Sequence, residues 1–511
     1  MTSNRLFNLP ADAAAQVEHR SRRAFLRRSA QLAFTGAALP TALNLATMGE
    51  AAAFTAPDGS YKALVCIFLY GANDYANTVV AYDDATYDKY SAIRGGGAGR
   101  TAGGIALAKT DLTATLLNPT APLAGGRQYA LHPSMPGLAG MFNAGQAAIQ
   151  LNVGPLIEPI TRAQYNAFAK KIPPKLFSHN DQQSIWQSSE SEGSTIGWGG
   201  NLGDFGVPVN GAGSTFSCVS VTGNAVFLAG DTALAYQVSK DGAVKLSSIA
   251  NTKIYNSSQV RTALNQLIVQ TGTGALESEY NKVTQRSIGA ESIVTGALAA
   301  GAAAVDSPNY AAFTPTMLTE NTLAGQLKMV ARMIAGRGGL GSPKRQVFMV
   351  SLGGFDLHDN LISQHPNLLR YVSDAMTAFY DATVKLGVDS QVTSFTASDF
   401  GRTLTSNGDG SDHGWGSHHF ITGGAVNGKA FYGYAPPMSI SDDLSKPENL
   451  WHVGQGRLLP TTSVDQYAAT MATWFGVEAS EMTRVVPNIG NFDNITQDGI
   501  NYQKNLGFMK P

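Results

Sequence analysis

The sequence predicts an α/β fold with a mostly parallel central sheet flanked by helices. Three segments, 62–77, 345–359 and 391–403, each begin with an apolar run and end in a loop rich in glycine and acidic residues. Continuous apolar runs rich in β-branched and aromatic residues are typical of strands covered on both faces. Between the second and third segments, apolar residues recur at helical spacing before a glycine: Leu368, Val372, Ala375, Met376, Phe379, Leu386 and Gly387. Strand, helix and strand predict a right-handed crossover between neighbouring parallel strands.

The first 53 residues have the order of a bacterial export signal. Arg22 and Arg23 precede a mildly apolar run, and the small residues 51–53 follow it. This order is typical of a signal peptide for the twin-arginine pathway. We therefore expect residues 1–53 to be cleaved after recognition by the twin-arginine translocase. The mature protein, 54–511, is expected to be periplasmic or secreted.

The elements between these segments follow from periodicity. A helix from about Met135 is predicted to feed a strand at 147–153, and another helix covers 323–335. Residues from about 205 to 320 mix short strand patterns with alanine- and glycine-rich helix. We expect an inserted, cap-like region there.

A helix near the C-terminus has clear boundary signals. Ser463 and Gln466 have the spacing of a capping box. The apolar-faced helix that they begin is expected to end at Gly476.

The composition excludes some classes of function. The 511-residue chain has 36 lysines plus arginines and 37 aspartates plus glutamates, a formal charge of -1, so no whole-chain field favours nucleic acid or an anionic membrane. Beyond the signal we expect no stretch that spans a bilayer. The stretch GGGAGR lacks the lysine and hydroxyl residue of a phosphate-binding P-loop. Cys66 lies in an apolar run and is expected to be a small buried hydrophobe.

Carboxylate and imidazole side chains gather at the ends of the predicted strands. In open α/β sheets, ligands bind outside the carboxyl ends of the strands, where we place Asp74, Asp356, His358 and Asp399. The loop 411–420, SDHGWGSHHF, adds an aspartate and three histidines. So many acids would repel one another unless cations neutralised them. Carboxylates with imidazoles suit zinc or manganese, and one or two such ions could promote ester hydrolysis.

The order of these residues carries a resemblance. An acidic strand end, a serine or threonine at a helix start, an aspartate with a histidine, a second aspartate and a late histidine resemble the alkaline phosphatase and sulfatase superfamily. The motifs GGFDLHD, SDFGRT, DHGWGSHHFITGGAVNGKAFYG and TTSVDQYAATMATWFGV more closely resemble its twin-arginine-exported branch, which is still labelled a domain of unknown function. The resemblance covers most of the mature chain and implies an alkaline phosphatase-like fold.

The resemblance also implies a set of metal ligands. Residue by residue, it assigns Asp356, His358 and His413 to one metal ion and Asp74 and Asp399 to a second. One departure affects the second site.

The superfamily usually has a histidine directly after the second aspartate, whereas Asp399 is followed by Phe400. That removes one ligand. His418, His419, His179 or a glutamine could replace it, or the site could hold one ion.

The nucleophile is a separate question. Ser134, in LHPSMPG, is expected to start a helix, where a helix N-terminus favours a bound anion and a lowered nucleophile pKa. Ser134 could equally be an ordinary N-cap, and Thr78 is the reserve candidate. Arg402 could bind the substrate's non-bridging oxygens or pair with one of the site's own acids. The resemblance gives Asp465 a structural role.

Two functions remain open from the sequence. The first is an exported metal-dependent hydrolase that acts on a small or polymeric phosphate or sulfate ester, or on a related phosphonate or phosphodiester. The second is a secreted or periplasmic binding or assembly protein that keeps the fold, and one metal, without turnover, because fold alone does not imply function.

Overall fold

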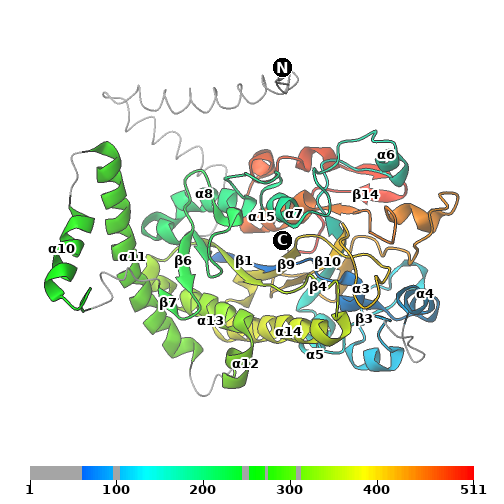
Figure 1. The fold of residues 1–511 in the computed structure, drawn as a ribbon, viewed down its shortest axis with the longest axis horizontal. Helices are drawn as coiled ribbons and strands as arrows, with labels where there is room; N and C mark the ends of the chain where they lie inside the picture. Colours follow the sequence, from blue (N-terminus) through cyan, green and yellow to red (C-terminus); the bar gives the residue numbers. More distant parts are fainter. Residues whose placement is uncertain (1–59, 96–103, 244–251, 271–273, 307–311, 511) are drawn as a thin grey trace, which may run out of the picture. The chain divides into compact units, whose positions relative to one another are not determined.

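The structure, a computed structural model, describes residues 60–95, 104–243, 252–270, 274–306 and 312–510. All of them belong to one compact unit, Phe54–Pro511. The predicted signal peptide, 1–53, lies outside the described residues. The described chain is a mixed α/β fold with a large, mostly parallel central sheet, as the sequence predicts (Figure 1).

The central sheet has the strand order β11-β4-β10-β9-β1-β8-β5-β6-β7, and β12 pairs with β4. Its strands are β1 Lys62–Leu69, β4 Ala147–Gly154, β5 Cys218–Ser220, β6 Tyr236–Ser239, β7 Gly242–Ala243, β8 Arg345–Leu352, β9 Val392–Ser398, β10 Ser417–Thr422, β11 Ala430–Tyr432 and β12 Thr462–Ser463. From β9 through β1, β8 and β5 to β6 all neighbouring pairs are parallel. Strand β10 is antiparallel to both β9 and β4.

Strand β1 lies in the middle of the parallel part. It pairs with β8 on one side and with β9 on the other, so the prediction that β8 and β9 are neighbours is wrong. The reason is that the N-terminal strand inserts between them and completes the hydrogen bonding of both. Every β1 residue after Lys62 is buried, which explains its continuous apolar sequence. The carboxyl ends of the three strands consequently meet at one edge.

Helices cover both faces of the sheet (Figure 1). On one face, α13 Thr322–Ala335 packs against β8 and against α14 Leu361–Lys385, which in turn contacts α5 Pro136–Asn143. On the other face, α8 Trp198–Asn210 packs on β8, α15 Val464–Phe475 on β1, and α7 His179–Ser188 on β9. The structure therefore has three layers, helix, sheet and helix.

The predicted helices and their caps are largely confirmed. Helix α15 has the capping box of Ser463 and Gln466 and ends at Gly476 with a φ of 119°, a left-handed conformation that favours glycine. Helix α13 starts after the side-chain cap Asn321. The N-cap of α5 is Met135, and it makes no side-chain capping bond. Ser134 is therefore not the cap of this helix.

Part of the region at about 205–320, where an inserted, cap-like region is expected, belongs to the central sheet. Strands β5, β6 and β7 extend the central sheet beyond β8. The helices that follow are α10 Ser258–Val269, α11 Ala275–Val305 and α12 Pro315–Glu320. Helix α11 packs directly on α13: a Cβ added at Gly301 would lie 2.0 Å from the carbonyl oxygen of Arg332. The small residues in this region thus allow two helix backbones to approach closely.

One described helix is long and apolar enough to cross a membrane by length and composition, Ile288–Val305 within α11. This differs from the expectation that no stretch beyond the signal would qualify. The fold itself accounts for part of the apolar character of this helix, because Val294, Ala297 and Leu298 belong to the hydrophobic core.

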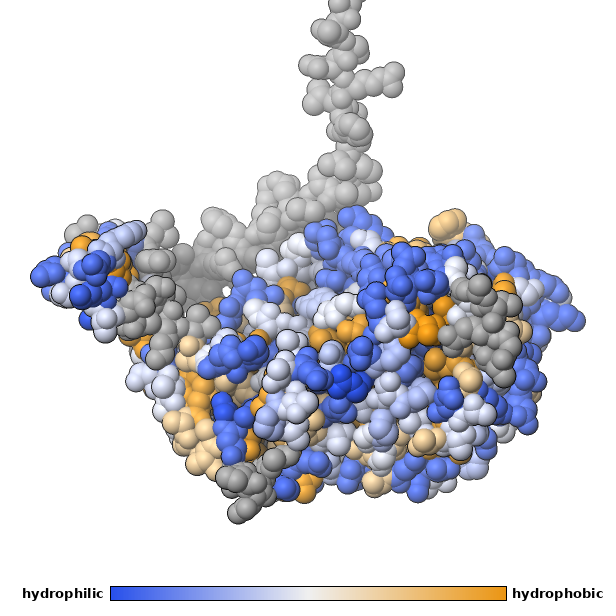
Figure 2. All heavy atoms as spheres, turned by 60° about the horizontal axis from the view of Figure 1, so that its bottom comes forward, coloured by the Kyte–Doolittle hydropathy of each residue, from blue (hydrophilic) through white to orange (hydrophobic). Residues whose placement is uncertain are grey.

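The surface and the cysteines agree with the bulk composition. Figure 2 shows hydrophilic and hydrophobic side chains interspersed on the face that it displays. Cys66 and Cys218 are both free and buried, which confirms that Cys66 is a small buried hydrophobe.

Candidate metal centre

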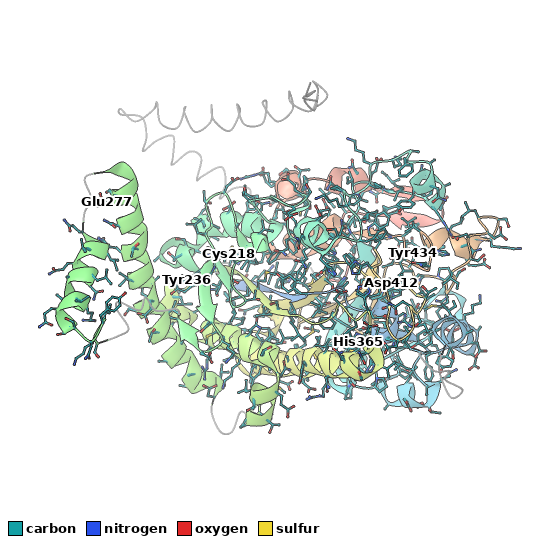
Figure 3. All side chains as sticks on the ribbon, in the orientation of Figure 1. Cys218, Tyr236, Glu277, His365, Asp412 and Tyr434 are labelled. Carbon is teal, nitrogen blue, oxygen red and sulfur yellow. The ribbon has the colours of Figure 1, made fainter. Side chains whose placement is uncertain are left out.

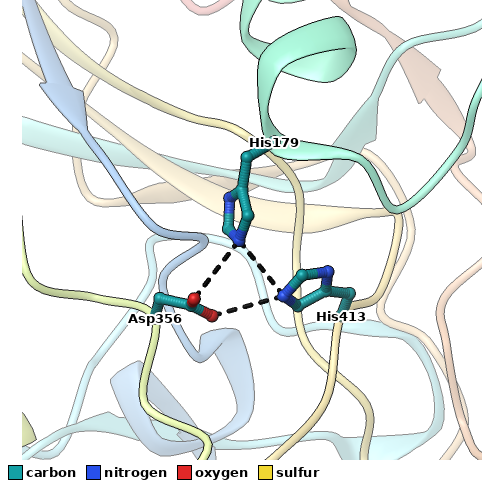
Figure 4. A group of neighbouring side chains, drawn as sticks. All are labelled: His179, Asp356 and His413. Carbon is teal, nitrogen blue, oxygen red and sulfur yellow. Dashed lines mark hydrogen bonds and ion pairs between the residues drawn. The ribbon is translucent and has the colours of Figure 1, made fainter.

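A cluster of imidazole and carboxylate groups lies at the carboxyl edge of the sheet. Asp356 follows β8, His413 precedes β10, and His179 is the first residue of α7. His179 Nε2 lies 3.1 Å from His413 Nε2 and 3.4 Å from Asp356 Oδ2, and His413 Nε2 lies 3.3 Å from Asp356 Oδ1. Figure 4 shows the three side chains pointing toward one another. Within the described residues, their ligand atoms all fit inside 4.8 Å of one another.

His358 adds a fourth donor to this cluster. Its Nε2 lies 3.0 Å from His413 Nε2 and 3.1 Å from Asp356 Oδ1. His358 therefore borders the same carboxylate and the same Nε2 of His413, while the ligand atoms that all lie within 4.8 Å of one another are those of His179, Asp356 and His413. We call His179, Asp356, His358 and His413 the metal cluster.

The outer nitrogen of each imidazole contacts an acceptor that has no proton to give. His179 Nδ1 lies 2.5 Å from Asp399 Oδ2. His413 Nδ1 lies 2.7 Å from the carbonyl oxygen of Phe177. His358 Nδ1 lies 3.1 Å from Asp412 Oδ1. Each Nδ1 must donate, so in the neutral imidazole each Nε2 carries a lone pair.

The lone pair on His413 Nε2 faces the lone pairs of His179 and His358 at about 3 Å, and these nitrogens cannot hydrogen-bond without an added proton. They need a cation among them, either protons or a metal ion. Metal-bound histidines typically donate their other ring N–H to a carboxylate or a carbonyl, as all three histidines do here. Tetrahedral ligands on bonds of about 2.0–2.1 Å stand about 3.4 Å apart, close to the 3.1–3.4 Å between the ligand atoms of His179, Asp356 and His413. Three such ligands leave the fourth position of the ion open. The donor set therefore fits a zinc-sized divalent ion.

The metal cluster is accessible to solvent. The side chains of His179, Asp356, His358 and His413 are 27%, 44%, 41% and 25% exposed. A fully enclosed structural zinc site would bury such ligands, whereas a catalytic site keeps one side open to water or substrate. The arrangement is suited to chemistry on a small ligand that approaches from solvent.

The family of the chain follows from a comparison with known families. The family model described as "Protein of unknown function (DUF1501)" matches residues 61–483. The chain belongs to this family. The match runs from the start of β1 beyond α15, so it includes the central sheet and every residue of the metal cluster. No curated protein matches this DUF1501 chain significantly.

In this DUF1501 protein, Asp399 lies next to the metal cluster and contacts it through His179. Its carboxylate is completely buried, and Oδ2 accepts from Gln183 Nε2 at 2.9 Å and from Gly71 N at 3.2 Å as well as from His179. His179 and Gln183 are four residues apart on α7 and so reach the same oxygen from one helix face. Asp399 Oδ1 is buried and has no hydrogen-bond partner among the residues that the structure describes. Asp399 orients His179, and its hydrogen bond raises the pKa of that histidine.

Arg402 pairs with one of the site's own acids. Its side chain is fully buried, and Nη1 donates to Asp356 Oδ1 at 2.6 Å. Nη2 donates to the carbonyl oxygen of Ser411. Burial alone would raise the pKa of Asp356, but the hydrogen bond and charge of Arg402 outweigh it and hold that pKa below its usual value. The guanidinium thus fixes the carboxylate in its ionised form.

Asp74 is neutralised by the protein itself. Its Oδ2 accepts from Arg94 Nη2 at 2.6 Å and from Ser411 Oγ at 2.7 Å. Its Oδ1 caps α3 Tyr75–Thr78 through the backbone N–H of Asn77. Burial opposes ionisation, yet Arg94, His365 and Ser411 lower the pKa of Asp74. The structure therefore places Asp74 beside a guanidinium rather than in the metal cluster, so one of the predicted repelling acids already has its cation.

The two nucleophile candidates have other neighbours. The backbone N–H of Ser134 donates to His132 Nδ1 at 3.0 Å. Thr78 Oγ1 donates to the carbonyl oxygen of Asp74 at 2.7 Å. His132 lies 6.0 Å, ring to ring, from His365 of α14, which Figure 3 labels together with Asp412. Among the described contacts, none joins Ser134 or Thr78 to the metal cluster.

Of the histidines that could replace the missing ligand, some lie away from the metal cluster. His418 lies on β10, is buried, and accepts the backbone N–H of Asn152 at Nδ1. His419 is also buried on β10, with its ring 4.7 Å from that of Trp186. Only His179 joins the metal cluster. Phe400 packs its ring against His179 and His413, at 4.9 and 4.8 Å, and so forms an apolar wall beside these two imidazoles.

The segment that carries His179 has few signals in the sequence. Phe177 has a φ of 72°, an uncommon conformation for a residue other than glycine, and its carbonyl oxygen holds His413. Such strain tends to persist where function requires it. In the sequence, Asp412 is only one acid of the loop 411–420. The position of His179 at the start of α7 marks it as a candidate ligand, but its spacing along the chain does not relate it to Asp356.

Proposed function

We propose that this protein is a hydrolase that cleaves phosphate or sulfate esters with one divalent metal ion, zinc or manganese, held by the metal cluster. The single observation that carries this proposal is the convergence of three Nε2 lone pairs on the carboxylate of Asp356. A divalent ion in such a set supplies Lewis-acid polarisation of an ester oxygen and of a water molecule.

The surrounding residues have defined roles in this proposal. Asp399, Asp412 and the carbonyl of Phe177 hold the three imidazoles in the tautomer that offers Nε2. Arg402 keeps Asp356 ionised. Because these partners are already in place, the donors need little rearrangement when an ion enters.

The nucleophile of the proposed reaction is a water molecule or Ser134. A water molecule needs no further side chain at the metal cluster. Ser134 requires an approach to the cluster, because its described contact runs to His132. Ser134→Ala therefore distinguishes the two: an unchanged kcat supports water, and a loss of activity with retained metal supports the serine.

The wider assignments remain part of the proposal. The order of the acidic and histidine motifs, and their position at the carboxyl edge of a mostly parallel sheet, support an alkaline phosphatase-like fold. The paired arginines Arg22 and Arg23 support export by the twin-arginine translocase into the periplasm or beyond.

A catalytically silent binding protein is the second candidate, and one observation favours it. Arg402, whose guanidinium contacts the metal cluster directly, is buried and paired with Asp356. It is not available to bind the substrate's non-bridging oxygens. A protein that binds metal without turnover would need no such donor.

The test is hydrolysis by zinc- and manganese-loaded protein of p-nitrophenyl phosphate, bis(p-nitrophenyl) phosphate and p-nitrophenyl sulfate. The proposal predicts turnover of at least one ester, and its loss in His413→Ala. The matched control is His452→Gln, because His452 is buried outside the metal cluster and its replacement should leave turnover intact. Metal-loaded wild type that turns over none of the esters would favour the binding protein.

A further inference from the structure

The fixed charges around the metal cluster nearly cancel. The carboxylate of Asp356 is paired with Arg402. Asp399 and Asp412 contact the outer nitrogens of His179 and His358. The further charged group that contacts the cluster is Arg457, whose Nε donates to the carbonyl oxygen of His413 at 2.8 Å and whose guanidinium lies 5.3 Å from the ring of Phe177.

Two further ion pairs near the cluster neutralise themselves. Asp74 is paired with Arg94 at 2.6 Å, and Lys175 is paired with Asp181 at 3.3 Å. They add no net charge to the site. The three imidazoles are neutral when they bind a metal.

The balance can be stated in whole charges. A divalent ion contributes two positive charges, and Arg402 and Arg457 contribute one each. Asp356, Asp399 and Asp412 contribute one negative charge each. Counted over the groups that contact the cluster, the site with one bound ion therefore carries a net charge of about one positive unit, enough for one negative charge of a ligand.

We propose that the metal cluster takes monoanionic esters of tetrahedral oxyanions, namely phosphodiesters or sulfate monoesters, in preference to dianionic phosphate monoesters. This inference rests on the proposed function and specifies its substrate class. A dianion would bring a second negative charge that no group at the cluster balances, and leaving it unpaired in a partly buried site costs free energy. Arg402 cannot meet that charge, because its side chain is fully buried and already donates to Asp356 and Ser411.

Binding of small esters tests the proposal without requiring turnover. Isothermal calorimetry on the zinc-loaded protein compares trimethyl phosphate, dimethyl phosphate and methyl phosphate, which differ in charge but share one core. At pH 7.5 the neutral, monoanionic and dianionic members are all present in one form, since the second pKa of a phosphate monoester is about 6. We expect dimethyl phosphate to bind at least tenfold more tightly than methyl phosphate, and trimethyl phosphate to bind most weakly.

A change of pH gives an independent readout. Below about pH 6 methyl phosphate becomes a monoanion, so its affinity relative to dimethyl phosphate should rise. Dimethyl phosphate measured at the same pH corrects for any loss of metal. Equal or tighter binding of methyl phosphate at pH 7.5, or no binding of either anion, would overturn the proposal.

Methyl sulfate, a monoanion of different chemistry, separates the two sources of substrate. Tighter binding than dimethyl phosphate indicates sulfate monoesters, and weaker binding indicates phosphodiesters. Preferential binding of the monoanions without hydrolysis of any ester would leave this inference standing while the proposed function fails. If phosphate monoesters are instead hydrolysed fastest, the proposed function stands and this inference about the substrate class fails.

Replacement of Arg457 tests the charge balance itself. Arg457→Gln removes one positive charge while the metal cluster is left intact, so dimethyl phosphate should bind several-fold more weakly at unchanged zinc content. Arg370→Gln is the matched control, because Arg370 pairs with Glu320 on an exposed surface. Equal anion affinity in Arg457→Gln and wild type would contradict the charge count.

Discussion

The two ring nitrogens of His413 face opposite kinds of neighbour. Nδ1 is held by a carbonyl oxygen at 2.7 Å, while Nε2 meets the Nε2 atoms of His179 and His358 within 3.1 Å. The same division applies to His179 and His358. At the residue scale, the outer hydrogen bonds are therefore what decide that lone pairs, and not protons, point inward.

Asp399→Asn tests this orientation. The amide is a weaker partner for His179 Nδ1 than the carboxylate, so the imidazole should be held less firmly and be less basic. We expect the affinity for zinc to fall about 10- to 100-fold, measured by competition with a chromogenic chelator.

The control for that measurement is Asp493→Asn, because Asp493 is an exposed partner of Lys504. Its zinc affinity should match that of wild type. An unchanged affinity in Asp399→Asn would show that the Asp399–His179 contact does not orient a ligand.

At the element scale, the approach of α11 to α13 depends on single glycines. A Cβ at Gly301 would lie 2.0 Å from the carbonyl oxygen of Arg332, whereas a Cβ at Gly296, on the same helix, would meet nothing within 4 Å. Substitution of Gly296 by alanine therefore changes helix propensity alone, whereas the same substitution at Gly301 also changes the packing of α11 on α13.

Gly301→Ala should destabilise the protein by about 1–3 kcal/mol, because the helices must move apart to admit the methyl group. Gly296→Ala should instead stabilise it by about 0.5–1 kcal/mol, since alanine favours a helix over glycine. Denaturation by urea measures both. Equal effects of the two substitutions would contradict the close contact between α11 and α13.

At the scale of the whole molecule, the sequence predicts the parallel sheet, several helices and part of the metal cluster. Asp356, His358 and His413 belong to loops that follow or precede buried strands, so the topology alone brings them to one edge. His179 comes from a helix distant in sequence, and Arg94 reaches Asp74 only after the chain has folded. Neither contact leaves a spacing that a sequence can reveal. The insertion of β1 between β8 and β9 likewise depends on pairing between segments that are far apart in the sequence.

The buried histidines of the whole molecule predict instability in acid. Burial lowers the pKa of His132 to about 4 and the pKa of His365, His418 and His419 to about 3. Their unfolded pKa is about 6.5, so the unfolded chain binds more protons below that pH. The stability is complete above pH 6.5 and is lost as the pH falls toward the folded values.

Each of these histidines should remove about 1.4 kcal/mol of unfolding free energy per pH unit between about pH 6 and pH 4. Urea denaturation of chelator-treated protein measures the slope without a contribution from bound metal. A free energy of unfolding that stays constant from pH 7 to pH 5 would contradict the burial of neutral imidazoles.

The most direct test of the metal cluster is the metal content per chain, measured by elemental mass spectrometry on protein dialysed against excess zinc. We predict about one ion per chain in wild type, about one in Asp74→Asn, because Asp74 is paired with Arg94, and none in His413→Ala. Two ions per chain in wild type, with one lost in Asp74→Asn, would contradict the single-ion cluster. So would an ion that remains bound in His413→Ala.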